Sequence, residues 1–247
     1  MNFLDLGLSE KTVQAITETG IVTPTTVQTD VIPAILDGKD IFTIAPGGCG
    51  KTISYVLPLV DIINRKNKNN ILIITSDSAK SVTISDTFAL LDRFHEEQEN
   101  EKEEDESDVI IGSPDLILEL SQENRIDLSQ INILVVDDIN LIKKNKQIAN
   151  LEKILEILPA DKQNIVYTNR RSKETQDILD KILKSPQEIK VDKNKDEEAR
   201  NVSAKENKHP APVFDKEALE LEKKNNSFKG HTPKFLLLQA DLAPNCD

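Results

Sequence analysis

The segment from Ala45 to Thr52 contains the residues best suited to chemistry in this chain, and its sequence is APGGCGKT. Glycines at this spacing let the backbone curl so that several N–H groups face one anion. The start of a following helix would add its own preference for negative charge. A plain glycine-rich turn is the alternative, but a chance match to this pattern occurs on the order of a few per cent of the time. The residues expected to contact a bound nucleotide are Gly47, Gly48, Cys49, Gly50, Lys51 and Thr52.

Lys51 and Thr52 give this loop a specific chemistry. The Lys51 ammonium is expected to reach the β- and γ-phosphates, and the Thr52 hydroxyl to ligate Mg²⁺. Such a loop also needs a carboxylate from a neighbouring strand end, and Asp137 and Asp138 directly follow the apolar run ILVV. Asp137 is expected to orient the Mg²⁺ and Asp138 to polarise the attacking water. The alternative is an Asp-rich turn that merely ends a strand.

Short apolar runs alternate with helix-like segments between residues 1 and 191. Ser9 can cap a helix that stops at Gly20, and a second helix is expected to begin near Thr25. Runs that are apolar throughout are typical of parallel sheets covered on both faces. The pattern therefore predicts an open, mainly parallel α/β sheet flanked by helices, with ligands at the carboxyl ends of the strands. The expected strands are Asp40–Ala45, Ile71–Thr75, Val109–Ile111, Ile131–Val136, Ile165–Thr168 and Glu188–Val191, and further helices are expected near 50–64, 151–158 and 172–183.

Charge is distributed unevenly along the 247 residues. The chain has 31 Lys and Arg against 43 Asp and Glu, a net charge of −12 that disfavours broad electrostatic capture of nucleic acid. The acidic run Glu96–Glu106 is expected to form a solvated segment. Residues 192–247 are rich in charge and are expected to form a disordered tail after the domain at 1–191. Either segment is a candidate docking site for a protein partner.

Several features indicate an intracellular protein without a membrane partner. No apolar run approaches the ~18 residues needed to span a bilayer, and the first residues lack the pattern of a secretory signal. Cys49 and Cys246 fit no disulfide or metal framework, which is typical of a reducing compartment. A cytoplasmic location is expected, with the nucleus as an alternative.

Residues 3–191 resemble the first RecA-like domain of DEAD-box RNA helicases. The segment Pro24–Gln28, with Phe3 and Gly20 upstream and Gly38–Asp40 downstream, reproduces the adenine-reading Q motif of that family. The resemblance implies that Gln28 contacts the adenine edge, which suits an amide with both donor and acceptor, and that Phe3 stacks nearby. It also implies ATP or ADP as ligand, together with Mg²⁺.

Other motifs of that family are altered in this sequence. The tetrapeptide Asp-Glu-Ala-Asp reads DDIN at 137–140, so that the shorter Asp138 stands where the family has its catalytic Glu. The Ser-Ala-Thr motif reads TNR at 168–170. The RNA-gripping segments Pro-Thr-Arg-Glu-Leu-Ala and Thr-Pro-Gly-Arg read TSDSAK at 75–80 and SPDL at 113–116. Both phosphate-contacting arginines are lost, so RNA binding is expected to be weak.

The resemblance leaves two functions open. The first is ATP-dependent RNA remodelling with a second RecA-like lobe supplied by a partner chain, because the 56 residues after Val191 (247 − 191) are too few for a domain of ~100. The second is a catalytically silent pseudo-helicase that serves as an interaction scaffold. The intact Q motif and phosphate loop favour nucleotide binding, whereas Asp138, Asn140 and Arg170 favour silence.

Overall fold

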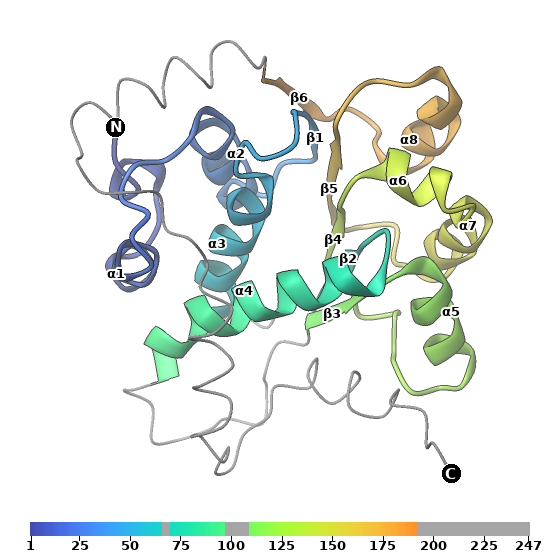
Figure 1. Ribbon diagram of the computed structural model, residues 1–247. Helices are drawn as coiled ribbons and strands as arrows, with labels where there is room; N and C mark the ends of the chain where they lie inside the picture. Colours follow the sequence, from blue (N-terminus) through green and yellow to red (C-terminus); the bar gives the residue numbers. More distant parts are fainter. Residues whose placement is uncertain (66–69, 97–108, 192–247) are drawn as a thin grey trace.

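A six-stranded parallel sheet forms the centre of the protein (Figure 1). The computed structural model describes residues 1–65, 70–96 and 109–191. The order across the sheet is β3-β2-β4-β5-β1-β6, and every pair of neighbouring strands is parallel. The carboxyl ends of all six strands therefore lie at the same edge. The strands are β1 (Ile41–Ile44), β2 (Ile71–Ile74), β3 (Val109–Gly112), β4 (Ile133–Val136), β5 (Gln163–Thr168) and β6 (Gln187–Lys190).

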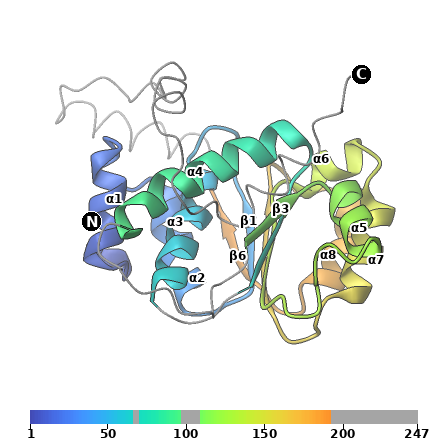
Figure 2. The same ribbon diagram turned by 90° about the horizontal axis from the view of Figure 1, so that it is seen from below.

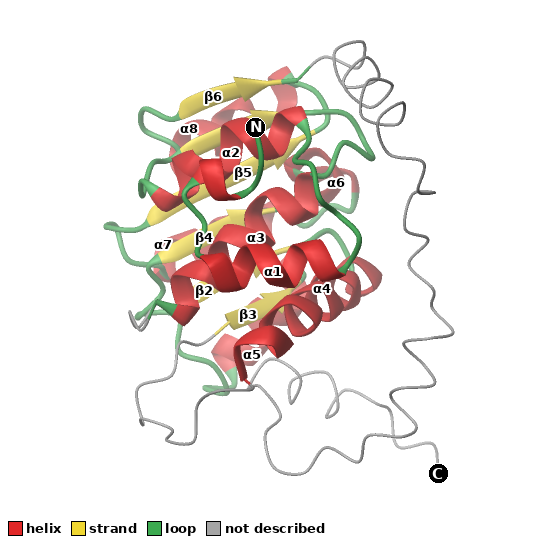
Figure 3. Cartoon of the chain, turned by 90° about the vertical axis from the view of Figure 1, so that its left-hand side faces the viewer, coloured by secondary structure: helices red, strands yellow, loops and turns green. Residues whose placement is uncertain are grey.

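Helices cover both faces of the sheet, as Figure 2 shows from below. Helices α1 to α4 pack on one face and α5 to α8 on the other, so that alternate strand residues enter two separate apolar clusters. Figure 3 shows the strands side by side behind the α1–α4 layer. The helices are α1 (Glu10–Glu18), α2 (Thr26–Leu36), α3 (Lys51–Asn64), α4 (Ser78–Glu96), α5 (Pro114–Gln122), α6 (Ile139–Lys144), α7 (Ile148–Ile157) and α8 (Gln176–Ile182).

Local sequence signals set several of these boundaries as predicted. The Ser9 hydroxyl accepts a hydrogen bond from the Thr12 amide at 3.3 Å and caps α1. Thr25 and Gln28 form a reciprocal capping box at the start of α2. Every expected strand is present, with ends that differ by one or two residues. The predicted open α/β sheet is confirmed, and it is wholly parallel.

The structure differs from the expected helices in one place. The segment 172–183 is not one helix: a 3₁₀ turn at Lys173–Thr175 precedes α8. The Ser172 side chain caps the 3₁₀ turn by accepting from the Glu174 amide, and α8 begins only at Gln176. A local hydroxyl bond thus competes with continuous helix.

Two predictions fall on residues outside the described ranges. The tail at 192–247 lies beyond them, and of the acidic run only Glu96, the last residue of α4, is inside. The domain boundary after residue 191 stays a prediction. Among the described residues, no helix is both long and apolar enough to cross a membrane.

Candidate nucleotide-binding site

The phosphate loop joins β1 to α3, and two of its glycines have positive φ. Gly48 has a φ of 79° and Gly50 a φ of 91°, a region that residues with a Cβ rarely adopt. A Cβ on Gly50 would also lie 2.6 Å from Gln28 Nε2. Gly50 is therefore required both by the backbone and by its neighbour. The strand, loop and helix predicted for this segment are confirmed.

Lys51, the first residue of α3, extends its side chain back along the loop. Its Nζ donates to the carbonyl oxygens of Ala45 at 2.8 Å and Pro46 at 3.2 Å. The buried Cys49 thiol donates to the same Pro46 carbonyl at 3.0 Å. A lysine ammonium and the N-terminus of a 14-residue helix thus meet on one loop, an arrangement suited to anions.

The predicted Q motif packs directly on this loop. Thr25 Oγ1 donates to the Cys49 carbonyl at 2.9 Å. The Gln28 amide accepts from the Thr25 N–H at 2.9 Å and donates to the Gly50 carbonyl at 3.3 Å. Gln28 is buried, and it braces the loop. These bonds use one N–H and one lone pair of its amide, and the contact of Gln28 with an adenine edge stays a prediction.

Phe3 does not present a ring face in this arrangement. Its side chain is only 1% exposed and belongs to the apolar cluster beneath α1 to α4. In this arrangement Phe3 is a core residue, and its expected stacking beside an adenine stays a prediction. An aromatic ring buries a large apolar area, so packing in the core is favourable for Phe3.

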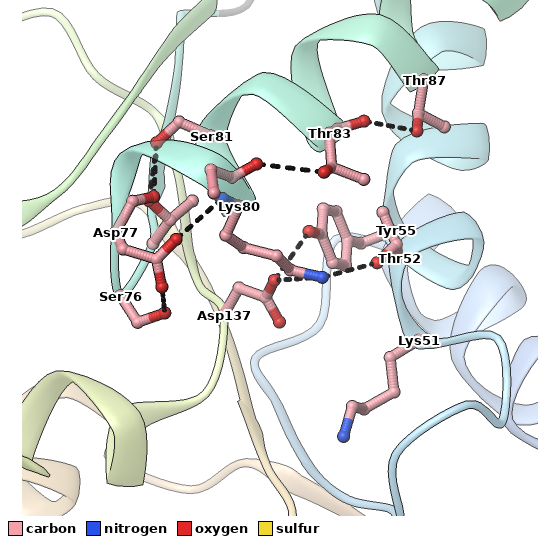
Figure 4. Close-up of polar contacts among 12 residues, drawn as sticks. Lys51, Thr52, Tyr55, Ser76, Asp77, Lys80, Ser81, Thr83, Thr87 and Asp137 are labelled. Atoms are coloured by element: carbon pink, nitrogen blue, oxygen red, sulfur yellow. Dashed lines mark hydrogen bonds and ion pairs between the residues drawn. The ribbon is translucent and has the colours of Figure 1, made fainter. Parts of the chain in front are cut away.

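Thr52 and Asp137, the two residues predicted to ligate Mg²⁺, converge on the same cation, and this cation is a lysine. Lys80 Nζ lies 3.3 Å from Asp137 Oδ2 and donates to Thr52 Oγ1 at 3.1 Å (Figure 4). Tyr55 OH donates to the same Asp137 oxygen at 3.3 Å. Burial and the Asp137 charge raise the pKa of Tyr55, so that its phenol stays protonated and donates. The facing oxygens of the predicted metal site thus already contact an ammonium.

Asp138, predicted to polarise water, is turned toward its own helix. It has a φ of 64° and its Oδ1 accepts from the Leu141 amide at 3.4 Å, at the N-terminus of α6. Burial raises the pKa of the Asp138 carboxyl, and the field of Lys51 does not cancel this effect. A carboxylate in this position caps a helix. Its catalytic role stays a prediction.

Asn140 joins the two altered motifs to each other. Its Nδ2 donates to Thr168 Oγ1 at 2.7 Å and to the Arg170 carbonyl at 2.8 Å. Thr175 Oγ1 donates to the Asn140 side-chain oxygen at 3.3 Å. An amide, unlike a carboxylate, can donate and accept at once, so the residue at 140 suits these partners.

Among the described residues, no three His, Cys, Asp or Glu side chains gather as a metal site.

Comparison with known proteins identifies the family. The profile of the DEAD/DEAH box helicases matches residues 25–178, which is more than half of the chain. The chain belongs to this family. It is similar to the RNA helicase CrhR of Synechocystis, with 29% identity over 55% of this chain and 30% of that protein. It is also similar to the DEAD-box ATP-dependent RNA helicase CshC of Bacillus cereus, with 27% identity over 58% of this chain and 40% of that protein.

The fold of the chain is also similar to that of solved DEAD-box proteins. A crystal structure of a DEAD box protein from Methanococcus jannaschii superimposes with a TM-score of 0.70 at 24% identity, covering 78% of this chain and 57% of that one. The chain thus spans well under two thirds of these relatives. The predicted RecA-like fold of DEAD-box type is confirmed.

The two segments that grip RNA in DEAD-box helicases serve this chain's own structure. Asp77 stands in place of the first lost arginine, and it caps α4 by accepting from the Lys80 amide at 2.9 Å. Asp115, beside the second, accepts from Asn150 at 2.7 Å and Gln147 at 3.1 Å. The backbone bonds of Lys80 and the bond from Ser76 hold the pKa of Asp77 below its usual value. The Asp77 carboxylate is therefore held in its charged form at this edge of the sheet.

Sequence reasoning missed Lys80 as a site residue. It stands where the DEAD-box segment Pro-Thr-Arg-Glu-Leu-Ala ends in alanine, and the change was interpreted only as a weakened RNA grip. The available signal was a lysine in the first turn of the helix that follows β2, because β2 pairs with β4 and Asp137 directly follows β4. Strand order, which the sequence does not reveal, brings these residues together.

Proposed function

We propose that this domain binds ATP or ADP through its phosphate loop and Q motif. In this proposal the loop N–H groups and Lys51 bind the phosphates, and the Gln28 side-chain amide contacts the adenine edge. The observation that carries the proposal is the loop itself: Gly50 and Lys51 open α3, and Thr25 and Gln28 brace the loop from outside.

Lys51→Ala tests this proposal. The substitution removes the ammonium at the centre of the loop but none of the bonds from Thr25 and Gln28, so the fold should persist while adenine-nucleotide affinity falls at least ~tenfold, a loss of ~1.4 kcal/mol. Isothermal titration with ATP and ADP, in Mg²⁺ and in EDTA, measures it. The exposed Lys144 is the matched control, since Lys144→Ala removes a surface ammonium from the end of α6 and not from the loop. Equal affinities in wild type and Lys51→Ala would contradict the proposal.

At the level of the whole protein, we propose RNA remodelling when a second lobe comes from a partner. The relatives named above are RNA helicases, and the chain shares their first domain. In such enzymes the opposing lobe supplies an arginine whose loss costs ~10³–10⁵ in rate. RNA contact by this domain alone is proposed to be weak.

The second candidate is a nucleotide-binding scaffold without turnover. It is favoured by Asp138, whose carboxylate caps α6, and by the hydrogen bond that Asn140 donates to Thr168. A phosphate-release assay separates the two candidates. Turnover of ~1 s⁻¹ or more, within the ordinary enzyme range, that Lys51→Ala abolishes, would exclude the scaffold. Nucleotide binding without phosphate release, with and without single-stranded RNA, would support it.

A further inference from the structure

Lys80 occupies the place that a divalent cation would take between Thr52 and Asp137. Its Nζ is within 3.1 Å of the Thr52 hydroxyl oxygen and 3.3 Å of the Asp137 carboxylate. Figure 4 shows the ammonium between these two groups, with Tyr55 on the same carboxylate oxygen and Lys51 extended separately. The two oxygens come from α3 and from the end of β4, and the cation from α4.

The surroundings place this ammonium, whose side chain is 36% exposed, beside a buried carboxylate. Asp137 is 3% exposed, so its charge is costly without a partner. The start of α4 is fixed by Asp77, whose side chain caps the helix, and by Asn145, which donates to the Ser76 carbonyl at 2.8 Å. Lys80 therefore extends from an anchored helical turn to a buried carboxylate. Lysine carries three donors and no acceptor. One of these donors bonds to Thr52 Oγ1, and the ammonium charge pairs with Asp137.

A divalent ion does not fit beside this ammonium. Mg²⁺ bound by Thr52 and Asp137 would lie within a few ångströms of the Lys80 ammonium in this arrangement, and the two cations would repel each other. It would also have to take the oxygens that Lys80 now contacts. Mg²⁺ loses its water shell reluctantly and needs near-ideal octahedral geometry. A carboxylate that is buried and already paired with an ammonium is therefore a poor ligand for it.

We infer that Lys80 is a built-in cation and that the nucleotide site works without a divalent metal. A remaining N–H of Lys80, together with the Lys51 ammonium, would then bind the phosphate oxygens. The ligand class is a metal-free adenine nucleotide rather than its Mg²⁺ complex. The nucleotide part of this inference rests on the proposed function, whereas the exclusion of metal does not.

The first experiment uses metal alone. The melting temperature of the full chain is measured with 0 to ~10 mM Mg²⁺, and Mn²⁺ binding is followed by electron paramagnetic resonance. Wild type and the matched control Lys143→Ala should show no rise in melting temperature with Mg²⁺ and no Mn²⁺ binding. Lys143, like Lys80, is about two-fifths exposed and paired with a carboxylate, that of Glu174. Lys80→Ala exposes Asp137 to the ion, so its melting temperature should rise with Mg²⁺ and it should bind Mn²⁺.

The second experiment compares nucleotide affinity in EDTA and in Mg²⁺ by titration. Wild type and Lys143→Ala should bind ATP in EDTA at least as tightly as in Mg²⁺. Lys80→Ala should bind it about tenfold tighter in Mg²⁺, a typical coupling between two ligands. If Lys80→Ala fails to fold, the wild-type comparison still decides.

The two proposals fail in different ways. Binding of Mn²⁺ by the wild-type chain at Asp137, or ATP affinity that needs Mg²⁺ in wild type, would show that Lys80 gives way to metal and would overturn this inference. Absence of ATP binding by every variant in both buffers would overturn the proposed function. In that case the metal-alone experiment still tests the role of Lys80.

Discussion

Gly50 is the residue at which the phosphate loop and the Q motif meet. Its carbonyl accepts from Gln28 Nε2, its φ is 91°, and its missing side chain leaves room for the Gln28 amide. Any residue could supply the carbonyl, but the positive φ favours glycine and the room left for the Gln28 amide requires it. The loop sequence therefore encodes contact with α2 as well as with a ligand.

Gly50→Ala should destabilise the domain by about 1–3 kcal/mol, because alanine is strained at positive φ and its Cβ would displace the Gln28 amide. Gly47→Ala is the matched control: no heavy atom lies within 4 Å of its Cβ position, so its stability should change by less than about 0.5 kcal/mol. Urea denaturation midpoints give both values. Equal midpoints for the two variants would refute this account of the loop.

At the scale of elements, Asp61 of α3 holds the N-terminus of α1. Its Oδ1 accepts from the Ser9 amide at 2.9 Å and from Thr12 Oγ1 at 2.7 Å, and Arg65 pairs with the other oxygen. Burial raises the pKa of the Asp61 carboxyl, but these bonds and the Arg65 charge outweigh it and leave the pKa below its usual value. The same side chain thus caps one helix from another.

Asp61→Ala should cost about 2–6 kcal/mol, since two donors lose their acceptor at about 1–3 kcal/mol each. Asp37→Ala, which breaks an exposed pair with Lys39, should cost at most about 1 kcal/mol. The folded pKa of Asp61 is the lower one, so its contribution is complete above the unfolded value of 3.8 and disappears as pH falls through the folded pKa. Denaturation midpoints from pH 7 to 3 should show a constant gap between wild type and Asp61→Ala that narrows below about 3.8. A gap that widens on acidification would contradict the assignment.

The sequence predicted those elements whose signals are local. Strand–loop–helix order, the Ser9 cap and the start of a helix near Thr25 each depend on neighbours within a few residues. The fate of Phe3 and the position of Lys80 depend on packing between distant segments, and no local pattern carries that information. The family resemblance implied that Phe3 stacks beside an adenine, whereas the structure shows its ring in the apolar core.

At the scale of the whole molecule, two carboxylates lie in the segments that grip RNA in DEAD-box helicases. The full chain carries a net charge of −12. Asp77 and Asp115 lie after β2 and β3, two neighbouring strands, at the carboxyl edge of the sheet. Both carboxylates are exposed and hydrogen-bonded within the chain. Phosphate groups would therefore meet two fixed negative charges instead of two arginines.

Single-stranded RNA should accordingly bind weakly, with a dissociation constant no tighter than the ~10⁻⁴–10⁻⁶ M of non-specific complexes. Asp77→Asn and Asp115→Asn together remove two charges but keep side chains that can cap and hydrogen-bond, so the fold should be unchanged and RNA affinity should rise several-fold. The matched control is Asp37→Asn with Asp180→Asn, which removes the same charge elsewhere on the surface. Fluorescence anisotropy at ~50 and ~150 mM salt separates a local effect from net charge, because screening weakens the distant charges first. An equal gain in the control would show that only net charge matters, and nanomolar binding by the wild-type chain at ~150 mM salt would show that RNA is held by another surface.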